Sequence, residues 1–148
     1  MLAIRNNQAE IVRTLLNIVG INVNQQDSRS WTALIFASWI GHLEIVEGIL
    51  QYGDEGQSIN VNHASTEGLT ALMLASICGH LDVARVLLAR PDIDVDRTDP
   101  NGHTALHYAA GSEHRIKKAV FLSRFLYDGS VFSFRSLPYL EASSGSLV

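Results

Sequence analysis

Residues 70–84, which read TALMLASICGHLDVA, decide the fold. The same pattern occurs 38 residues earlier as TALIFASWIGHLEIV at 32–46, and its first half occurs 34 residues later as TALHYAA at 104–110. A partial copy opens the chain, where Ile11-Val12 corresponds to Ile45-Val46 at an offset of 34. A period of roughly 20–50 residues marks repeat architectures. The sequence therefore predicts a stack of similar units, none of which can bury its apolar face alone.

Each unit reads as helix, turn, helix and then an extended finger. Thr32 and Thr70 precede an apolar run and are typical helix N-caps, and Gly41 and Gly79 end that helix because glycine tolerates a left-handed backbone. The second helix carries apolar residues at i, i+1, i+4 and i+5. These are Ile45, Val46, Ile49 and Leu50 in one unit and Val83, Ala84, Leu87 and Leu88 in the next. Tight turns are expected near 27–30 and 99–102.

Some positions depart from the common pattern. The 38-residue spacing is explained by about four extra residues within 53–58, which is polar and glycine-rich and is expected to form a surface loop. Gly48 falls inside the second helix, where it should cost about 1 kcal/mol relative to alanine. Ser30 stands where Gly68 and Gly102 stand in the other turns.

These residues resemble the ankyrin repeat, whose pattern runs Asp-x-x-Gly-x-Thr-Pro-Leu-His-x-Ala-Ala-x-x-Gly-His. The best match is DPNGHTALHYAA at 99–110. The resemblance implies a mainly α solenoid of stacked helix-turn-helix units with hairpin-like fingers. Of the histidines that usually follow Thr-x-Leu, only His107 is present, because Ile35 and Met73 replace the other two.

We interpret residues 1–128 as an ankyrin-repeat domain with units near 1–26, 27–64, 65–98 and 99–128, the first truncated and the last degenerate. Because the first unit is truncated, the chain is interpreted as an excerpt from a longer array. After Ala110 the repeat loses its phase, and 129–148 is expected to be an irregular tail. Three interpretations of the C-terminal part stay open: a degenerate capping repeat, an unrelated terminus, or a basic and aromatic docking arm.

Composition limits the functional class. The chain has 148 residues, 47% apolar and 18% charged, with a formal net charge of −4. This balance is globular, and the mild acidity argues against a nucleic-acid partner. No apolar run is long enough for a transmembrane helix, so no membrane insertion is expected. The single cysteine, Cys78, favours an intracellular setting, most simply the cytoplasm with the nucleus left open. We expect a monomer.

No catalytic or metal site is expected, and no cofactor. His42 and His80 follow the turn glycine in register, so they are interpreted as structural positions. In the family, the histidine at His107 bonds its own Thr104. His103 and His107 are four apart, but His103 precedes the helix, so a zinc pair is not favoured. The acidic run at 92–99 lacks the glycine and glutamate of a calcium loop, and no nucleophile–base pattern occurs. The chain is therefore not expected to be an enzyme.

The function expected from the resemblance is binding of a partner protein on the concave face, as a scaffold or adaptor. The alternative is a targeting or regulatory segment of a larger enzyme, receptor or channel. Partner-contacting positions of the family, carried onto this chain, are Arg29, Trp31, Trp39, Ile40, Glu67, Leu69, Ile77, Cys78, Asn101 and His103.

Two further expectations concern single side chains. Trp31 and Trp39 should be exposed as anchors beside Arg29, unless they only pack on each other and on adjacent fingers. Asn24 follows Val23 and lies eight residues after Leu16, which is the context that asparaginyl hydroxylases favour in ankyrin proteins. The alternative is that Asn24 only makes hydrogen bonds within its turn.

Overall fold

The computed structural model describes residues 4, 8–18, 21–54 and 58–111. It contains the helices α2 (Ala9–Leu16), α3 (Ala33–Ile40), α4 (Leu43–Asp54), α5 (Ala71–Cys78), α6 (Leu81–Leu88) and α7 (Ala105–Gly111). Within these residues β-type pairing is limited to one isolated antiparallel bridge, between Ala64 and Thr70. The fold is mainly α, as the repeat pattern predicts.

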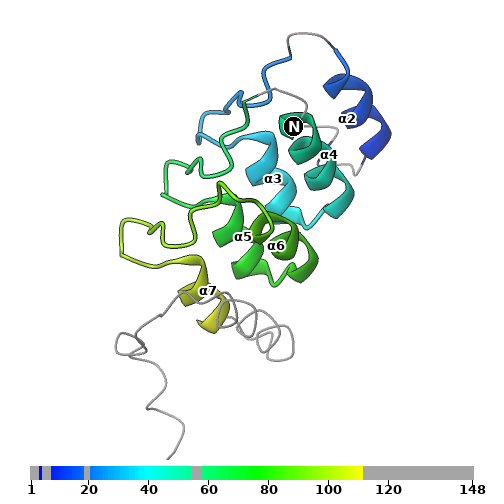
Figure 1. Cartoon of the computed structure of the whole chain (residues 1–148). Coiled ribbons are helices and arrows are strands. Elements are labelled where there is room, and N and C mark those ends of the chain that lie inside the picture. The colour runs from blue at the N-terminus through cyan, green and yellow to red at the C-terminus, as the bar shows by residue number, and fades with distance from the viewer. Residues whose placement is uncertain (1–3, 5–7, 19–20, 55–57, 112–148) are drawn as a thin grey trace, which may run out of the picture.

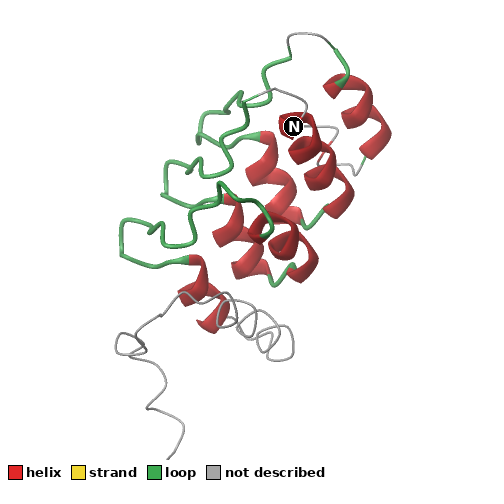
Figure 2. Ribbon diagram, in the orientation of Figure 1, coloured by secondary structure: helices red, strands yellow, loops and turns green. Residues whose placement is uncertain are grey.

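The helices form two layers (Figure 1). The inner layer is α3, α5 and α7, which pack side by side, and the outer layer is α2, α4 and α6. Helices α4 and α6 each follow a short turn and run back against α3 and α5, respectively. The loops that join successive units project to one side of the inner layer as fingers (Figure 2). Each sequence repeat thus folds into a similar structural unit, and each unit buries the apolar face of the next.

The helix boundaries are set by the residues that the sequence singles out. The Thr32 and Thr70 hydroxyls accept hydrogen bonds from the backbone N–H groups three residues on, both at 3.3 Å. Gly41 and Gly79 end α3 and α5 in left-handed conformation, with φ 88° and 68°. These predictions are confirmed. The capping bonds satisfy N–H groups that have no partner inside the helix.

The core runs along the seam between the two layers. Ala37 and Ala75 have no exposed surface, so the two inner helices approach closely there. Ile35 and Met73, which replace the usual family histidine, are each 1% exposed. Their apolar side chains occupy the repeat position that the hydrogen-bonding ring of His107 occupies in the last unit.

The extra residues of the second unit do not form only a loop. Helix α4 runs to Asp54, whereas α6 ends at Leu88, the counterpart of Leu50. The expectation of a surface loop beginning at Gly53 is therefore wrong for Gly53 and Asp54, which extend the helix by about one turn. Gly53 packs closely on Ile59, since a Cβ there would lie 3.0 Å from its side chain.

Neighbouring units are also linked through their fingers. The backbone N–H of Thr66 donates to the Arg29 carbonyl at 3.0 Å, and His63 Nε2 lies 3.0 Å from the Ser30 carbonyl oxygen. These contacts join the fingers of the second and third units beside the helical core. The expected degenerate fourth unit beyond residue 111 and the tail at 129–148 lie outside the described residues.

Candidate functional site

One side chain organises the turn of each finger. Asp27 Oδ1 accepts hydrogen bonds from the backbone N–H groups of Arg29 and Trp31 at 2.8 and 2.9 Å. Ser65 and Asp99 hold the corresponding positions and accept in the same way from residues two and four further on. The bond from the Trp31 N–H, followed by the bond and charge of Arg29, lowers the pKa of Asp27 despite some desolvation. The fingertips are therefore rigid supports for the side chains that they expose.

Each of these turns also needs one left-handed residue. Gly68 and Gly102 adopt φ 78° and 81° there, and Ser30 adopts φ 57°. The turn at Ser30 still closes, because its N–H donates to the Asp27 carbonyl at 3.0 Å. The contact between the Ser30 carbonyl and His63 supports this strained backbone from the next unit.

Three aromatic rings form a cluster between α3 and the finger of the second unit, whose turn is at 27–30 (the fingers of the third and fourth units turn at 65–68 and 99–102). Trp31, Phe36 and Trp39 contact one another edge to face, with ring centroids 5.4 to 5.8 Å apart. The Arg29 guanidinium carbon lies 4.6 Å from the centroid of the Trp31 ring, which is cation–π distance. The cluster therefore carries one cation on a rigid aromatic base.

The two tryptophans differ in exposure. Trp39 is 43% exposed, but Trp31 is 5% exposed. The expectation that both are exposed is wrong for Trp31, because Phe36, Trp39 and Arg29 cover its ring. Trp31 Nε1 is buried and has no hydrogen-bond partner among the described residues. The alternative expectation, in which the two tryptophans pack on each other, describes the contact that is present.

The remaining residues of the expected site fall on the fingers and the inner helices. Ile40 follows Trp39 at the end of α3, and Ile77 and Cys78 hold the same positions in α5; all three are half-buried. Glu67 is exposed at the third fingertip and Leu69 is half-buried at its base. Asn101 and His103 are exposed on the fourth finger. Trp39 and Arg29 are exposed near the second unit, and Glu67 is exposed in the third. Half-buried apolar surface beside them comes from Ile40, Leu69, Ile77 and Cys78.

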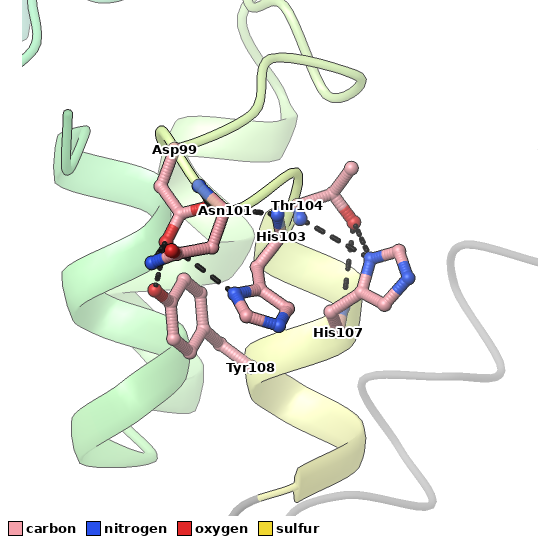
Figure 3. Close-up of polar contacts among 6 residues, drawn as sticks. All are labelled: Asp99, Asn101, His103, Thr104, His107 and Tyr108. Carbon is pink, nitrogen blue, oxygen red and sulfur yellow. Dashed lines mark hydrogen bonds and ion pairs between the residues drawn. The ribbon is translucent and has the colours of Figure 1, made fainter. Parts of the chain in front are cut away.

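The fourth finger contains a second polar cluster, around Asp99 (Figure 3). Asp99 is 6% exposed, and its Oδ1 accepts from the N–H groups of Asn101 and His103 at 2.9 and 2.7 Å. Its Oδ2 accepts from the Tyr108 hydroxyl at 2.7 Å and lies 3.4 Å from His103 Nδ1. A buried carboxylate is stabilised in its charged form when several donors surround it in this way.

The cluster shifts two pKa values in opposite directions. Burial alone would raise the pKa of Asp99, but the hydrogen bonds from Tyr108, His103 and Asn101 outweigh it and hold the pKa well below its ordinary value. Burial, then the hydrogen bond to Asp99 and its charge, raise the pKa of Tyr108 to about 12. Asp99 is therefore a fixed anion and Tyr108 a fixed donor, so the pair stabilises the finger and is unsuited to proton transfer near neutral pH.

His107 makes the internal contact that the family resemblance implies. The Thr104 N–H donates to His107 Nδ1 at 3.2 Å, and Thr104 Oγ1 lies 2.8 Å from the same nitrogen (Figure 3). Since Nδ1 accepts from the backbone, its proton lies on Nε2 in the neutral ring. His103 and His107 lie with ring centroids 6.0 Å apart and point to different partners.

Asn24 bridges two units. Its side-chain amide donates to the Ser58 carbonyl at 2.6 Å and accepts from the Asn60 N–H at 3.0 Å. Asn62 repeats this arrangement one unit later, with the Asp92 carbonyl and the Asp94 N–H. The expectation that Asn24 bonds only within its turn is wrong, because both side-chain bonds cross to the next unit. Hydroxylation of Asn24 stays a prediction.

The described residues contain no group of three or more His, Cys, Asp or Glu side chains that could hold a metal ion. Burial raises the pKa of the Cys78 thiol, which lowers its fraction of reactive thiolate. The helices in the described part of the chain are all too short or too polar to cross a bilayer.

Sequence reasoning missed two members of these clusters. Phe36 completes the aromatic cluster, and its signal is its spacing of three residues from Trp39, which places both on one side of α3. Tyr108 holds Asp99 from nine residues further on, a relationship that depends on how the finger folds back over α7.

Comparison with known proteins agrees with this architecture. The family model described as ankyrin repeats (3 copies) matches residues 1–63, and the model described as ankyrin repeats (many copies) matches residues 54–109. No curated protein matches the chain significantly. Domains of this kind are generally non-catalytic modules for protein–protein interaction. Two overlapping matches and the repeated helix pairs place the chain in the ankyrin-repeat family.

Proposed function

We propose that this chain binds a partner protein on the face formed by its fingers and inner helices, with Trp39 as the anchor. The observation that carries the proposal is the 43% exposure of Trp39 on a helix whose other large side chains are buried or half-buried. Edge-to-face contacts with Trp31 and Phe36 hold the indole in place. A large aromatic side chain that is already immobile loses little conformational entropy on binding, which is typical of hot-spot residues.

The surroundings of Trp39 suggest a mostly uncharged contact with one charged point. Ile40, Ile77 and Cys78 contribute half-buried apolar surface at the ends of α3 and α5. Arg29 supplies a cation whose nearest carboxylate, on Asp27, is 3.9 Å away and is occupied with capping the turn. We infer that the partner presents an apolar side chain to Trp39 and an acceptor to Arg29, with Glu67, Leu69, Asn101 and His103 at the rim.

Trp31 has a different part in this proposal from the one that the family pattern implies. It is a buried support on which Trp39 and Arg29 rest. Replacing Trp31 would therefore disturb both the fold and the binding face, whereas replacing Trp39 would chiefly affect binding. The chain acts as a scaffold or adaptor if one partner occupies this face while the remaining surface of the array is available to a second protein.

The test is quantitative capture from cell lysate by the full chain, read by mass spectrometry. We compare the wild type with Trp39→Ala and with the matched variant Ile11→Ala, which removes an equally exposed apolar side chain, 47% exposed, from α2. A protein that the wild type and Ile11→Ala capture and Trp39→Ala loses would support the proposal. Equal capture by all three would contradict it.

A further inference from the structure

In each finger, the third residue of the turn complements the side chain that caps the turn. Arg29 Nε lies 3.9 Å from a carboxylate oxygen of the capping Asp27. In the third unit the hydroxyl of the capping serine donates to Glu67 Oε2 at 3.4 Å. In the fourth unit Asn101 Nδ2 donates to Asp99 Oδ2 at 3.4 Å (Figure 3). A reaction that turned the Asn101 amide into an acid would therefore set a carboxylate against a buried carboxylate.

Asn101 is also the one asparagine of the sequence that precedes a glycine. Both residues are exposed at the fingertip, and nothing lies within 4 Å of the position that a Cβ on Gly102 would occupy. The backbone nitrogen of Gly102 thus has no side chain of its own residue to shield it. Attack of this nitrogen on the side-chain carbonyl carbon of Asn101 closes a five-membered ring. Such an intramolecular reaction has a high effective concentration.

The other described asparagines lack this arrangement. Asn24 and Asn62 each make two side-chain hydrogen bonds to the backbone of the next unit. The residue that follows Asn17, Asn22 and Asn60 is isoleucine or valine, whose branched side chain crowds the backbone nitrogen. Asn101 is therefore distinguished both by the residue that follows it and by its exposure at a turn.

We propose that Asn101 is a site of spontaneous deamidation and that its product loosens the fourth finger. The Gly102 nitrogen gives its proton to water or hydroxide and bonds to the side-chain carbonyl carbon of Asn101. The bond from that carbon to the amide nitrogen breaks, and ammonia leaves. Water then opens the cyclic imide: cleavage at the side-chain carbonyl gives an aspartate, and cleavage at the backbone carbonyl gives an isoaspartate. The net reaction converts an amide and water into a carboxylate and ammonium, without an oxidant or a reductant.

Two hydrogen bonds control when this reaction occurs. The Gly102 N–H donates to the Asp99 carbonyl at 3.0 Å, and the Asn101 amide donates to the Asp99 side chain. Attack requires both bonds to open. Asp99 is itself held by the Tyr108 hydroxyl at 2.7 Å, so the strength of this cap sets how often the turn opens. The reaction is therefore slower in the folded chain than in the unfolded chain, and faster when the cap is weakened.

The product no longer fits the turn. A carboxylate on residue 101 cannot donate to Asp99, and two like charges at this separation disfavour each other. In the isoaspartate, the backbone also gains a methylene group between the N–H groups of residues 101 and 103, which both donate to Asp99 Oδ1 in the native turn. The two N–H groups then lose the spacing that both bonds require. The conversion thus leads from a closed finger with a neutral tip to a looser finger with a charged tip.

The first test follows the full chain over time by peptide mapping and mass spectrometry, in water enriched in heavy oxygen. Asn101 should convert before the other described asparagines, which are internal controls in the same sample. The product should carry one heavy oxygen and be mainly isoaspartate. Tyr108→Phe should speed the conversion about tenfold, the change expected when one hydrogen bond to a charged group is lost. Unfolding in urea should also speed it.

The second test measures the effect of the product on the finger. Asn101→Asp supplies the aspartate, and Asn101→Ala is the matched control that removes the same donor without adding a charge. Native-state hydrogen exchange of the His103 amide, which donates to Asp99, should be faster in Asn101→Asp than in Asn101→Ala. The urea midpoint of Asn101→Asp should be the lower of the two.

Three results would overturn the proposal. If Asn101 converts in urea but stays intact in the folded chain, the turn closes the site completely. If Asn101 converts no faster than the other asparagines, the glycine after it gives no advantage. If the His103 amide exchanges equally in the two variants, the new charge does not loosen the finger. Trp39→Ala should leave all of these rates unchanged, so this proposal and the proposed partner contact are tested separately.

Discussion

The imidazole of His80 occupies the space beside Gly41, where a Cβ would lie 2.5 Å from His80 Nδ1. His80 Nε2 is 3.1 Å from the Trp39 carbonyl oxygen, so the ring of one unit is seated on the helix end of the unit before it. The Gly-His positions of two neighbouring units are therefore in contact. Because Gly41 has no side chain, the His80 ring of the next unit can pack against it.

Gly41→Ala should destabilise the fold through two effects. The left-handed backbone, at φ 88°, costs a non-glycine residue about 1–2 kcal/mol, and the new methyl group would displace His80. Gly102→Ala is the matched control, because Gly102 has φ 81° and nothing within 4 Å of its Cβ position. Urea unfolding should show a larger loss for Gly41→Ala. Equal losses would mean that the approach of His80 contributes nothing.

The two tryptophans should separate stability from binding. Trp31→Ala removes a side chain that is 5% exposed and should cost about 3–5 kcal/mol of unfolding free energy. Trp39→Ala removes edge-to-face contacts on the surface and should cost about 0.5–1.5 kcal/mol. Chemical denaturation of both variants is the measurement. A Trp39→Ala loss as large as that of Trp31→Ala would make Trp39 a core residue instead of an anchor.

The Asn24 amide should contribute to coupling between units. Asn24→Ala removes its bonds to Ser58 and Asn60, each worth about 0.5–1.5 kcal/mol, and should speed hydrogen exchange of the Asn60 amide. Asn22→Ala is the control, since within the described part of the chain Asn22 Oδ1 accepts only a local bond, from the Asn24 N–H. Equal exchange at Asn60 in the wild type and Asn24→Ala would contradict the coupling.

Hydroxylation of Asn24 is a separate prediction. In the folded chain the amide is engaged with the next unit, so an enzyme would have to act when those bonds open or before they form. Protein from native cells should contain the Asn24 peptide with the mass of one added oxygen. Its consistent absence would remove the idea.

The Asp99–Tyr108 pair should give stability a defined pH dependence. The pKa of Asp99 is lowered on folding, so its contribution is present above its ordinary value of 3.8 and is lost as the pH falls. The pKa of Tyr108 is raised from 10.0 to about 12, so its contribution is present below pH 10 and is lost as the pH rises toward 12. Unfolding free energy measured against pH should therefore decline at both ends.

Spectroscopic titration tests the pair directly. The absorbance difference between the wild type and Tyr108→Phe should report a tyrosine that ionises near pH 12. Asp99→Asn removes the negative charge beside Tyr108. It should therefore lower the pKa of Tyr108 toward its ordinary value of 10.0. An unchanged midpoint in Asp99→Asn would show that the carboxylate does not perturb Tyr108.

Much of the fold is determined by short-range features of the sequence. Thr32 and Thr70 cap helices with their own side chains, and Gly41 and Gly79 end helices through their own backbone freedom. These features act over three or four residues, and their recurrence in phase identified both the unit and the way units must stack. The candidate site was predicted in the same way, as positions in a repeat.

What the sequence by itself determined is therefore the repeated unit, its caps and the fingers and inner helices that carry the candidate site. The tertiary structure decided which of those positions are accessible. Trp31 and Trp39 have the same chemistry, but Phe36, Trp39 and Arg29 together cover the Trp31 ring, whereas Trp39 stays 43% exposed. Ile11 and Ile45 likewise share a pattern and differ in burial, because burial depends on what packs beside a residue from distant parts of the chain.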